Sequence, residues 1–225
     1  MAQAVDDLKH AHEHEEHPWF FHSHFTDVEQ QFDTAKLGMW TFLATEILMF
    51  GGLFVGYAIM FSMHPEAFHA GHHHLTVSLG VVNTAVLIFS SLTMALAVRS
   101  AQTSNKRGIV INLLVTIACA CGFLVVKYFE YSHKWHEGLL PGKYYTFAEG
   151  YVPHIETYFA LYFMMTGLHG IHVTVGIGLL VWILLRALKG RYSSAYYTQV
   201  ELVGLYWHLV DLIWIYLFPL LYLVS

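Results

Sequence analysis

The sequence predicts an all-α integral membrane protein built as a bundle of five transmembrane helices. Of its 225 residues 56% are apolar and 12% are charged, whereas soluble domains have about 45–50% and about 25%. Eight of the sixteen acidic residues fall within the first 33 positions, which leaves 18 charged residues among the following 192. This composition excludes an ordinary soluble enzyme, and the lack of a basic stripe excludes a nucleic-acid-binding protein.

The elements follow in order along the chain. Residues 1–33 are polar and rich in histidine, which predicts a flexible cytoplasmic arm that does not cross the membrane. Residues 34–225 form the predicted membrane domain, with spans at about 37–61, 75–98, 109–129, 158–188 and 200–224. Each run has the roughly 20 residues that a hydrocarbon layer about 30 Å thick requires of a helix. Helices are expected because lipid offers the backbone no other hydrogen-bond partner.

The lysines and arginines predict the orientation of the five spans. With five crossings, eight of the eleven basic residues lie on the same side as the N-terminus. The other three are Lys127, Lys134 and Lys143. Because basic residues are enriched in cytoplasmic connections, the N-terminus is expected in the cytoplasm and the C-terminus outside.

Glu46 lies about ten residues into the first predicted span, within the run WTFLATEILMF. An ionised group near the middle of a bilayer costs about 2.5–3.5 kcal/mol on insertion scales. Glu46 is therefore expected to face protein or water and to carry a proton. Two roles fit this position equally: a proton-relay or coupling group, and a protonated side chain that hydrogen-bonds a neighbouring helix.

Two histidines in the fourth span are three residues apart. His169 and His172 therefore share one helix face, and this spacing cannot place them on opposite sides of one haem. Metal ligation is accordingly disfavoured. Hydrogen bonding between tightly packed helices is the favoured interpretation, because Gly170, Thr174 and Gly178 form a small-residue face on the same helix.

The last span carries three ionisable residues on one face. Glu201, His208 and Asp211 are spaced by seven and three positions, which predicts an interior polar network. Asn83 in the second span is a weaker case of the same kind. The sequence contains no nucleophile–base pair, phosphate-binding loop or convincing metal site, so we expect no catalytic residue and no metal ligand in this chain.

Histidine-rich segments outside the spans offer weak, non-specific metal binding at most. They comprise His10, His12, His14 and His17 in the arm, and His64, His69, His72, His73 and His74 after the first span. We expect a solvated tail and a solvated loop.

Several of these stretches together resemble subunit III of haem–copper oxidases. The stretches TGLHGIHV at 166–173 and YWHLVDLIW at 206–214 look like the two signature stretches of that family. The run around Glu46 resembles the family helix with a buried, carbodiimide-reactive glutamate. VNT at 82–84 and YFEY at 128–131 match in the same order. The resemblance covers the chain from about Asp33 onward.

The number of spans points to one form of the family. The long form has seven spans, and a cleft between its first two helices and the rest holds lipids. Here a polar arm precedes the glutamate helix, so the chain resembles the short bacterial form with five spans. In that form the cleft is expected only where another subunit, such as an extended subunit I, supplies the missing pair.

The resemblance implies a non-redox subunit of a terminal respiratory oxidase of the cytochrome c oxidase type. Such a complex reduces oxygen to water and pumps protons across the bacterial plasma (inner) membrane. Subunit III would carry no haem or copper, bind phospholipid, contact subunits I and II, keep subunit I active and aid its proton uptake. Glu46 matches the family's glutamate, and Glu130, His169 and His172 match polar positions with a structural or lipid-related role.

Other functions remain as alternatives. Within the family, the alternatives are subunit III of a quinol oxidase and an accessory subunit of a nitric oxide reductase. The oxidase could also be part of a larger respiratory supercomplex. Outside the family, a small standalone transporter is the competing class. A transporter is expected to show a repeat or broken helices around a midplane site, and the sequence has neither.

Overall fold

The computed structural model describes residue 21 and residues 25–141 and 152–223. The chain divides into two compact units, residues 1–38 and residues 39–225. The arm histidines His10, His12, His14 and His17 lie outside the described residues, and the predicted boundary after residue 33 stays a prediction.

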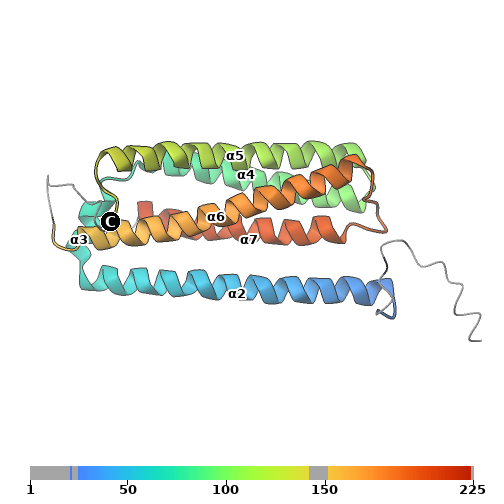
Figure 1. Ribbon diagram of the computed structural model, residues 1–225, viewed down its shortest axis with the longest axis horizontal. Coiled ribbons are helices and arrows are strands. Elements are labelled where there is room, and N and C mark those ends of the chain that lie inside the picture. Colours follow the sequence, from blue (N-terminus) through green and yellow to red (C-terminus); the bar gives the residue numbers. More distant parts are fainter. Residues whose placement is uncertain (1–20, 22–24, 142–151, 224–225) are drawn as a thin grey trace, which may run out of the picture. The chain divides into compact units, whose positions relative to one another are not determined.

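Six helices form the described part of the chain, five of which are long and apolar enough to cross a membrane. The five long helices confirm the predicted all-α membrane architecture (Figure 1). The bounds are α2 Val28–Met63, α3 Pro65–His72, α4 Val77–Gln102, α5 Lys106–His136, α6 Ile155–Leu188 and α7 Thr198–Tyr222. Most of these helices continue past the apolar runs that predicted them, because helical hydrogen bonding extends into polar residues.

Local signals in the sequence fix several helix ends. Before α2, the Asp27 carboxylate accepts a hydrogen bond from the Gln30 backbone N–H at 2.7 Å, and Asn105 caps α5 in the same way. Gly138 and Gly190 follow α5 and α6 with φ of 73° and 70°. The left-handed glycine is the usual way to end a helix.

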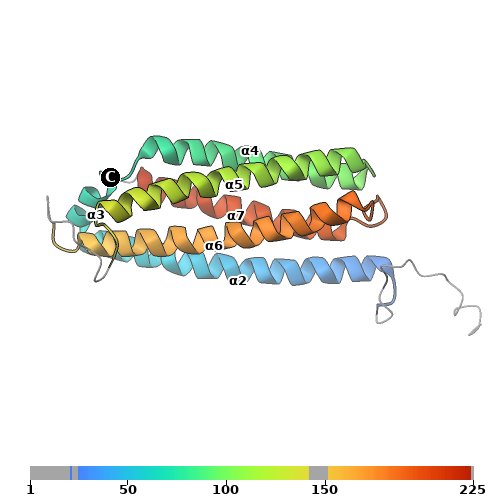
Figure 2. The same cartoon turned by 45° about the horizontal axis from the view of Figure 1, so that its top comes forward.

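Within residues 39–225, α4 packs against α5 and α7, and α6 packs against α5 and α7 (Figures 1 and 2). Close approach of these helices depends on glycine. A Cβ atom at Gly176 of α6 would lie 2.7 Å from the ring of Trp207 on α7. Trp207 and Trp214 are fully buried there, so the core lies among α4, α5, α6 and α7.

Helix α2 is held by a narrow seam. Its buried residues are Leu43, Phe50 and Tyr57, spaced by seven, which is the period of a single contact line along a helix. The Tyr57 hydroxyl donates to the Leu220 carbonyl of α7 at 3.0 Å. Much of the rest of α2 is exposed and apolar, as a surface facing lipid is expected to be.

Candidate functional site

The predicted carboxyl group of the first span has a specific partner. The Glu46 Oε2 atom on α2 lies 2.9 Å from the His172 Nε2 atom on α6. The other ring nitrogen, Nδ1, lies 2.8 Å from the Leu168 carbonyl oxygen. The two residues are 126 positions apart in the sequence, so the contact joins α2 to the rest of the bundle.

The contact with the Leu168 carbonyl shows which ring nitrogen of His172 carries a hydrogen. A carbonyl oxygen accepts hydrogen bonds and cannot donate them, so Nδ1 of His172 carries a hydrogen. Nε2 is then either bare and accepts a hydrogen from a neutral Glu46 carboxyl, or protonated and donates to a Glu46 carboxylate. In both cases one proton lies between the two side chains and the pair has no net charge.

An apolar cavity of about 400 Å³ borders His172. Its lining comes from α2, α6 and α7 and includes Phe42, His172, Leu179, Trp182 and Tyr206. The Tyr206 hydroxyl donates to the His172 backbone carbonyl at 3.0 Å. His172 therefore lies at the edge of an apolar space that an acyl chain would fit.

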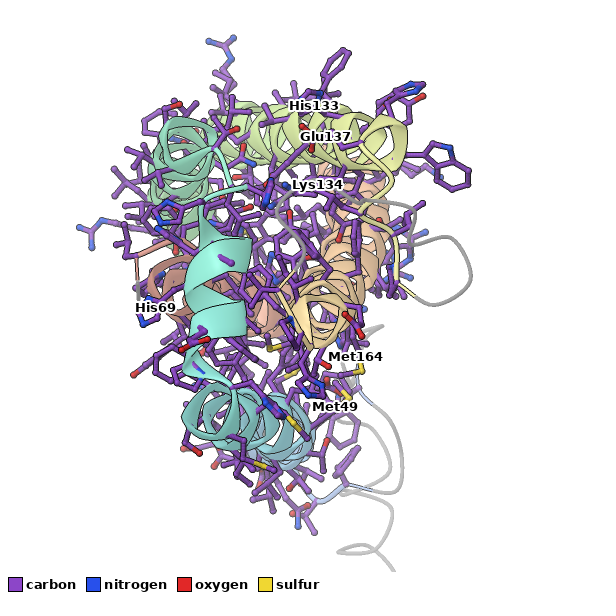
Figure 3. All side chains as sticks on the ribbon, turned by 90° about the vertical axis from the view of Figure 1, so that its left-hand side faces the viewer. Met49, His69, His133, Lys134, Glu137 and Met164 are labelled. Carbon is purple, nitrogen blue, oxygen red and sulfur yellow. The ribbon has the colours of Figure 1, made fainter. Side chains whose placement is uncertain are left out.

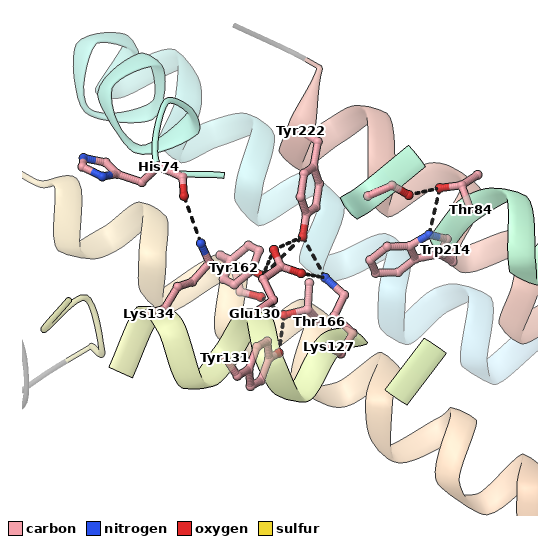
Figure 4. A network of polar contacts seen from close by, with 11 residues as sticks. His74, Thr84, Lys127, Glu130, Tyr131, Lys134, Tyr162, Thr166, Trp214 and Tyr222 are labelled. Atoms are coloured by element: carbon pink, nitrogen blue, oxygen red, sulfur yellow. Dashed lines mark hydrogen bonds and ion pairs between the residues drawn. The ribbon is translucent and has the colours of Figure 1, made fainter. Parts of the chain in front are cut away.

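A second polar site lies inside the bundle, toward the end of the long helices where α3 lies (Figure 4). Lys127 Nζ donates to Glu130 Oε2 at 2.8 Å and to the Tyr222 hydroxyl at 2.7 Å. The hydroxyls of Tyr162 and Tyr222 both donate to Glu130 Oε1. Lys127 is 8% exposed and Glu130 is 5% exposed. This is a buried ion pair whose charges are met by further hydrogen bonds, the condition under which such a pair is tolerated.

A second buried lysine lies one turn beyond Glu130. Lys134 Nζ donates to the His74 backbone carbonyl at 3.1 Å and lies over the Tyr162 ring. Figure 3 views this end of the bundle, where His133 and Lys134 lie in the last turn of α5 and Glu137 directly follows the helix. Lys127 and Lys134 are not among the predicted site residues, because in the sequence they count only as charges on the outer side. Their spacing of three and four from Glu130 on one helix face is the signal that could have found them.

The polar residues of α7 meet two serines of α4. Ser91 Oγ lies 2.7 Å from His208 Nδ1, and Ser90 Oγ donates to Asp211 Oδ2 at 3.4 Å. Asp211 is buried and His208 is half-buried. Glu201 lies two turns earlier, in the first turn of α7.

His169 and Asn83 are buried without hydrogen bonds to any of the described residues. His169 lies between the rings of Phe123 and Trp214, with ring centroids 5.5 and 5.3 Å away. His169 therefore points into the core, whereas His172 contacts Glu46 of α2. The two histidines thus have different neighbours. Within the described ranges, no three His, Cys, Asp or Glu side chains come close enough together to hold a metal ion.

Comparisons of the sequence with known proteins identify its relatives. The sequence profile of the family described as Cytochrome c oxidase subunit III matches residues 19–225. The chain is 31% identical over 194 residues to the cytochrome c oxidase subunit 3 of Thermostichus vulcanus, covering 86% of this chain and 89% of the relative. It is 28% identical over 207 residues to the quinol oxidase subunit 3 of Bacillus subtilis, covering 88% and 92%.

A third relative contains a similar stretch as part of a longer chain. The heme-copper oxidase subunit I+III of Aeropyrum pernix is 31% identical over 199 residues, which cover 85% of this chain and 23% of the relative. The match to the family profile extends over nearly the whole chain and includes all five spans. The chain therefore belongs to the cytochrome c oxidase subunit III family.

Proposed function

We propose that this chain is the non-redox subunit III of a proton-pumping terminal oxidase of the cytochrome c oxidase type, which reduces oxygen to water. It packs against the catalytic subunit I, stabilises it and supports its proton uptake. The observation that carries this proposal is the relative named subunit I+III, in which the two sequences share one chain. A covalent fusion of this kind is expected of subunits that lie side by side in the membrane.

Among the described residues, the two histidines of the fourth span do not fit a haem or copper centre. His169 is enclosed between Phe123 and Trp214, and both ring nitrogens of His172 are engaged, one by Leu168 and one by Glu46. Haem and copper are therefore assigned to the partner subunits. Phospholipid is assigned to the apolar cavity beside His172, whose lining offers acyl chains a matching surface.

Glu46 acts in this proposal mainly as a tie between helices. Helix α2 has three buried residues in its 36, so the bond to His172 adds a specific contact where apolar packing is sparse. Holding α2 in place would keep lipid ordered along this side of the complex and would protect subunit I during turnover.

Purification of the complex tests the assignment. An affinity tag on this chain should retain a haem-bearing subunit in fixed stoichiometry, and subunit II with it. The separated chain should show no haem absorption. A tagged chain that purifies without any haem protein from membranes containing the oxidase would contradict the proposal.

A quinol oxidase is the second candidate because several relatives, at 26–28% identity, are named for quinol. The two candidates differ in the electron donor of the whole complex. Oxygen consumption by the purified complex with reduced cytochrome c, or with a quinol in its place, distinguishes them.

A further inference from the structure

One face of α7 is left open by the other described helices. α7 is the most buried of the five spanning helices, yet residues spaced by three and four along it remain accessible. Leu212 is 49% exposed and Ile215 is 45% exposed, and Glu201, Leu205 and His208 are half-buried. We call these five residues the α7 stripe. Ser91 of α4 borders it through the contact with His208.

His208 gives this stripe an unmet hydrogen-bonding group. Its Nδ1 atom contacts Ser91, while its Nε2 atom makes no hydrogen bond to any residue in 25–141 or 152–223. Neutral imidazole has one donor and one acceptor nitrogen, so Nε2 always presents either an N–H or a lone pair. His172, by contrast, uses both ring nitrogens within the chain.

His208 lies so deep in the membrane that leaving its Nε2 atom without a hydrogen-bond partner in lipid is energetically unfavourable. His208 lies ten residues after the start of α7 at Thr198, or about 15 Å along a helix that rises 1.5 Å per residue. That distance is about half of a hydrocarbon layer roughly 30 Å thick. Acyl chains cannot hydrogen-bond a polar group at this depth, and a lipid headgroup remains at the membrane surface.

We propose that the α7 stripe is the docking surface for a transmembrane helix of subunit I, and that this helix presents a hydrogen-bonding side chain to Nε2 of His208. The inference rests on the proposed function. A protein helix fits where lipid does not, because it brings both an apolar surface for Leu205, Leu212 and Ile215 and a polar group at mid-depth. The relative named subunit I+III identifies subunit I as the membrane neighbour.

Photo-crosslinking in the complete complex tests the position of this surface. A photoreactive amino acid replaces Leu212, and the matched control replaces Val125 of α5, which is 53% exposed. Leu212 should crosslink to the haem-bearing subunit and Val125 should not. If the haem-bearing subunit co-purifies but only Val125 crosslinks to it, the docking surface is wrong and the proposed function stands. If no haem-bearing subunit co-purifies with the unmodified chain, the proposed function itself fails, and the docking surface with it.

Substitution of His208 tests the hydrogen bond. His208→Leu should lower the amount of subunit I retained after a detergent wash by about three- to thirtyfold, the range that hydrogen bonds between membrane helices provide. Ser91→Ala removes the bond to Nδ1 within the chain and leaves Nε2 in place, so it should retain subunit I like the unmodified chain. An equal loss in both variants would overturn the proposal, because the effect would then come from the α4–α7 contact.

Discussion

At the scale of single residues, Glu46 and His172 hold one proton between them on facing helices. Glu46→Gln supplies an amide that can donate to a bare Nε2 of His172, so this variant should hold α2 as the unmodified chain does. Glu46→Ala removes the contact and should destabilise the attachment of α2 by about 1 kcal/mol, within the range for polar contacts between membrane helices. Proteolysis or thermal unfolding of the complex in detergent measures the difference.

Proton pumping separates the two roles of Glu46. If the side chain acts as a tie, the Gln variant should pump as many protons per electron as the unmodified oxidase. A Gln variant that assembles fully and pumps markedly fewer protons would instead assign Glu46 to proton transfer. A hydrophobic carbodiimide offers an independent check, since it should label a neutral Glu46 carboxyl and should not label the Gln variant.

The buried ion pair makes a second prediction at this scale. Lys127→Met leaves the Glu130 carboxylate buried without its cation, which should cost about 3–5 kcal/mol of stability. Changing both residues, Lys127→Met with Glu130→Gln, removes both charges and should restore most of that loss. Thermal unfolding of the purified subunit in detergent provides the comparison. A double variant no more stable than the single one would mean that the packing of Lys127, and not the charge balance, is what matters.

His74, in the segment between α3 and α4, predicts a pH dependence. Burial lowers the pKa of His74 below its ordinary value of 6.5, while Glu137 opposes this shift and Lys134 and His73 add to it. The unfolded chain therefore binds a proton more readily than the folded one, so stability is complete above about pH 6.5 and falls as the pH drops below it. His74→Gln should flatten the fall in melting temperature between pH 7 and 5.5.

A matched histidine serves as the control for this pH dependence. His136, at the end of α5, is exposed, so His136→Gln should leave the slope of melting temperature against pH unchanged. A slope that persists in His74→Gln would assign the acid sensitivity to another group.

At the scale of helices, the contact of α6 with α7 depends on the absence of a side chain at Gly176. Gly176→Val would place atoms where the Trp207 ring lies and should destabilise the bundle by about 1–3 kcal/mol through overpacking. Gly178 is on the same helix with no atom within 4 Å of its position for a Cβ. Gly178→Val should therefore have little effect on the melting temperature, and an equal loss in both variants would assign the effect to helix propensity.

The long helices were predictable because lipid imposes a length and a composition on each span. The ends of the helices were less so: α2 begins at Val28 and α5 runs to His136, since polar residues continue a helix without any apolar signal. The prediction of a solvated loop after the first span is wrong at the short helix α3, although Pro65 at its first turn is a typical start of a helix.

The sequence predicts several residues of the candidate sites, but it does not predict which of them contact each other. Glu46 and His172 were each singled out because a polar residue in lipid is unusual. Their contact depends on the packing of α2 against α6, which a single sequence does not encode in any local pattern. Lys127 was missed because a lysine near the end of an apolar run suits the membrane surface equally well.

At the scale of the whole molecule, the uneven distribution of basic residues predicts a fixed orientation. Eight of eleven lysines and arginines lie on the side of the N-terminus, so a reporter enzyme fused after Ser225 should be active only outside the cytoplasm. A reporter fused in the link between α4 and α5, next to Asn105, should be active only inside. Cytoplasmic activity of the C-terminal fusion would mean that either the orientation or the number of spans is wrong.

The neutral Glu46–His172 pair also has a consequence for a membrane that carries a voltage. A potential of 100 mV does about 2.3 kcal/mol of work on a unit charge that crosses the whole membrane. Transfer of the shared proton moves charge over less than the 2.9 Å between the two atoms. That path is at most about a tenth of a hydrocarbon layer roughly 30 Å thick, so 100 mV could bias the transfer by only about 0.2 kcal/mol. The bond that holds α2 is therefore equally strong in a resting and in an energised membrane.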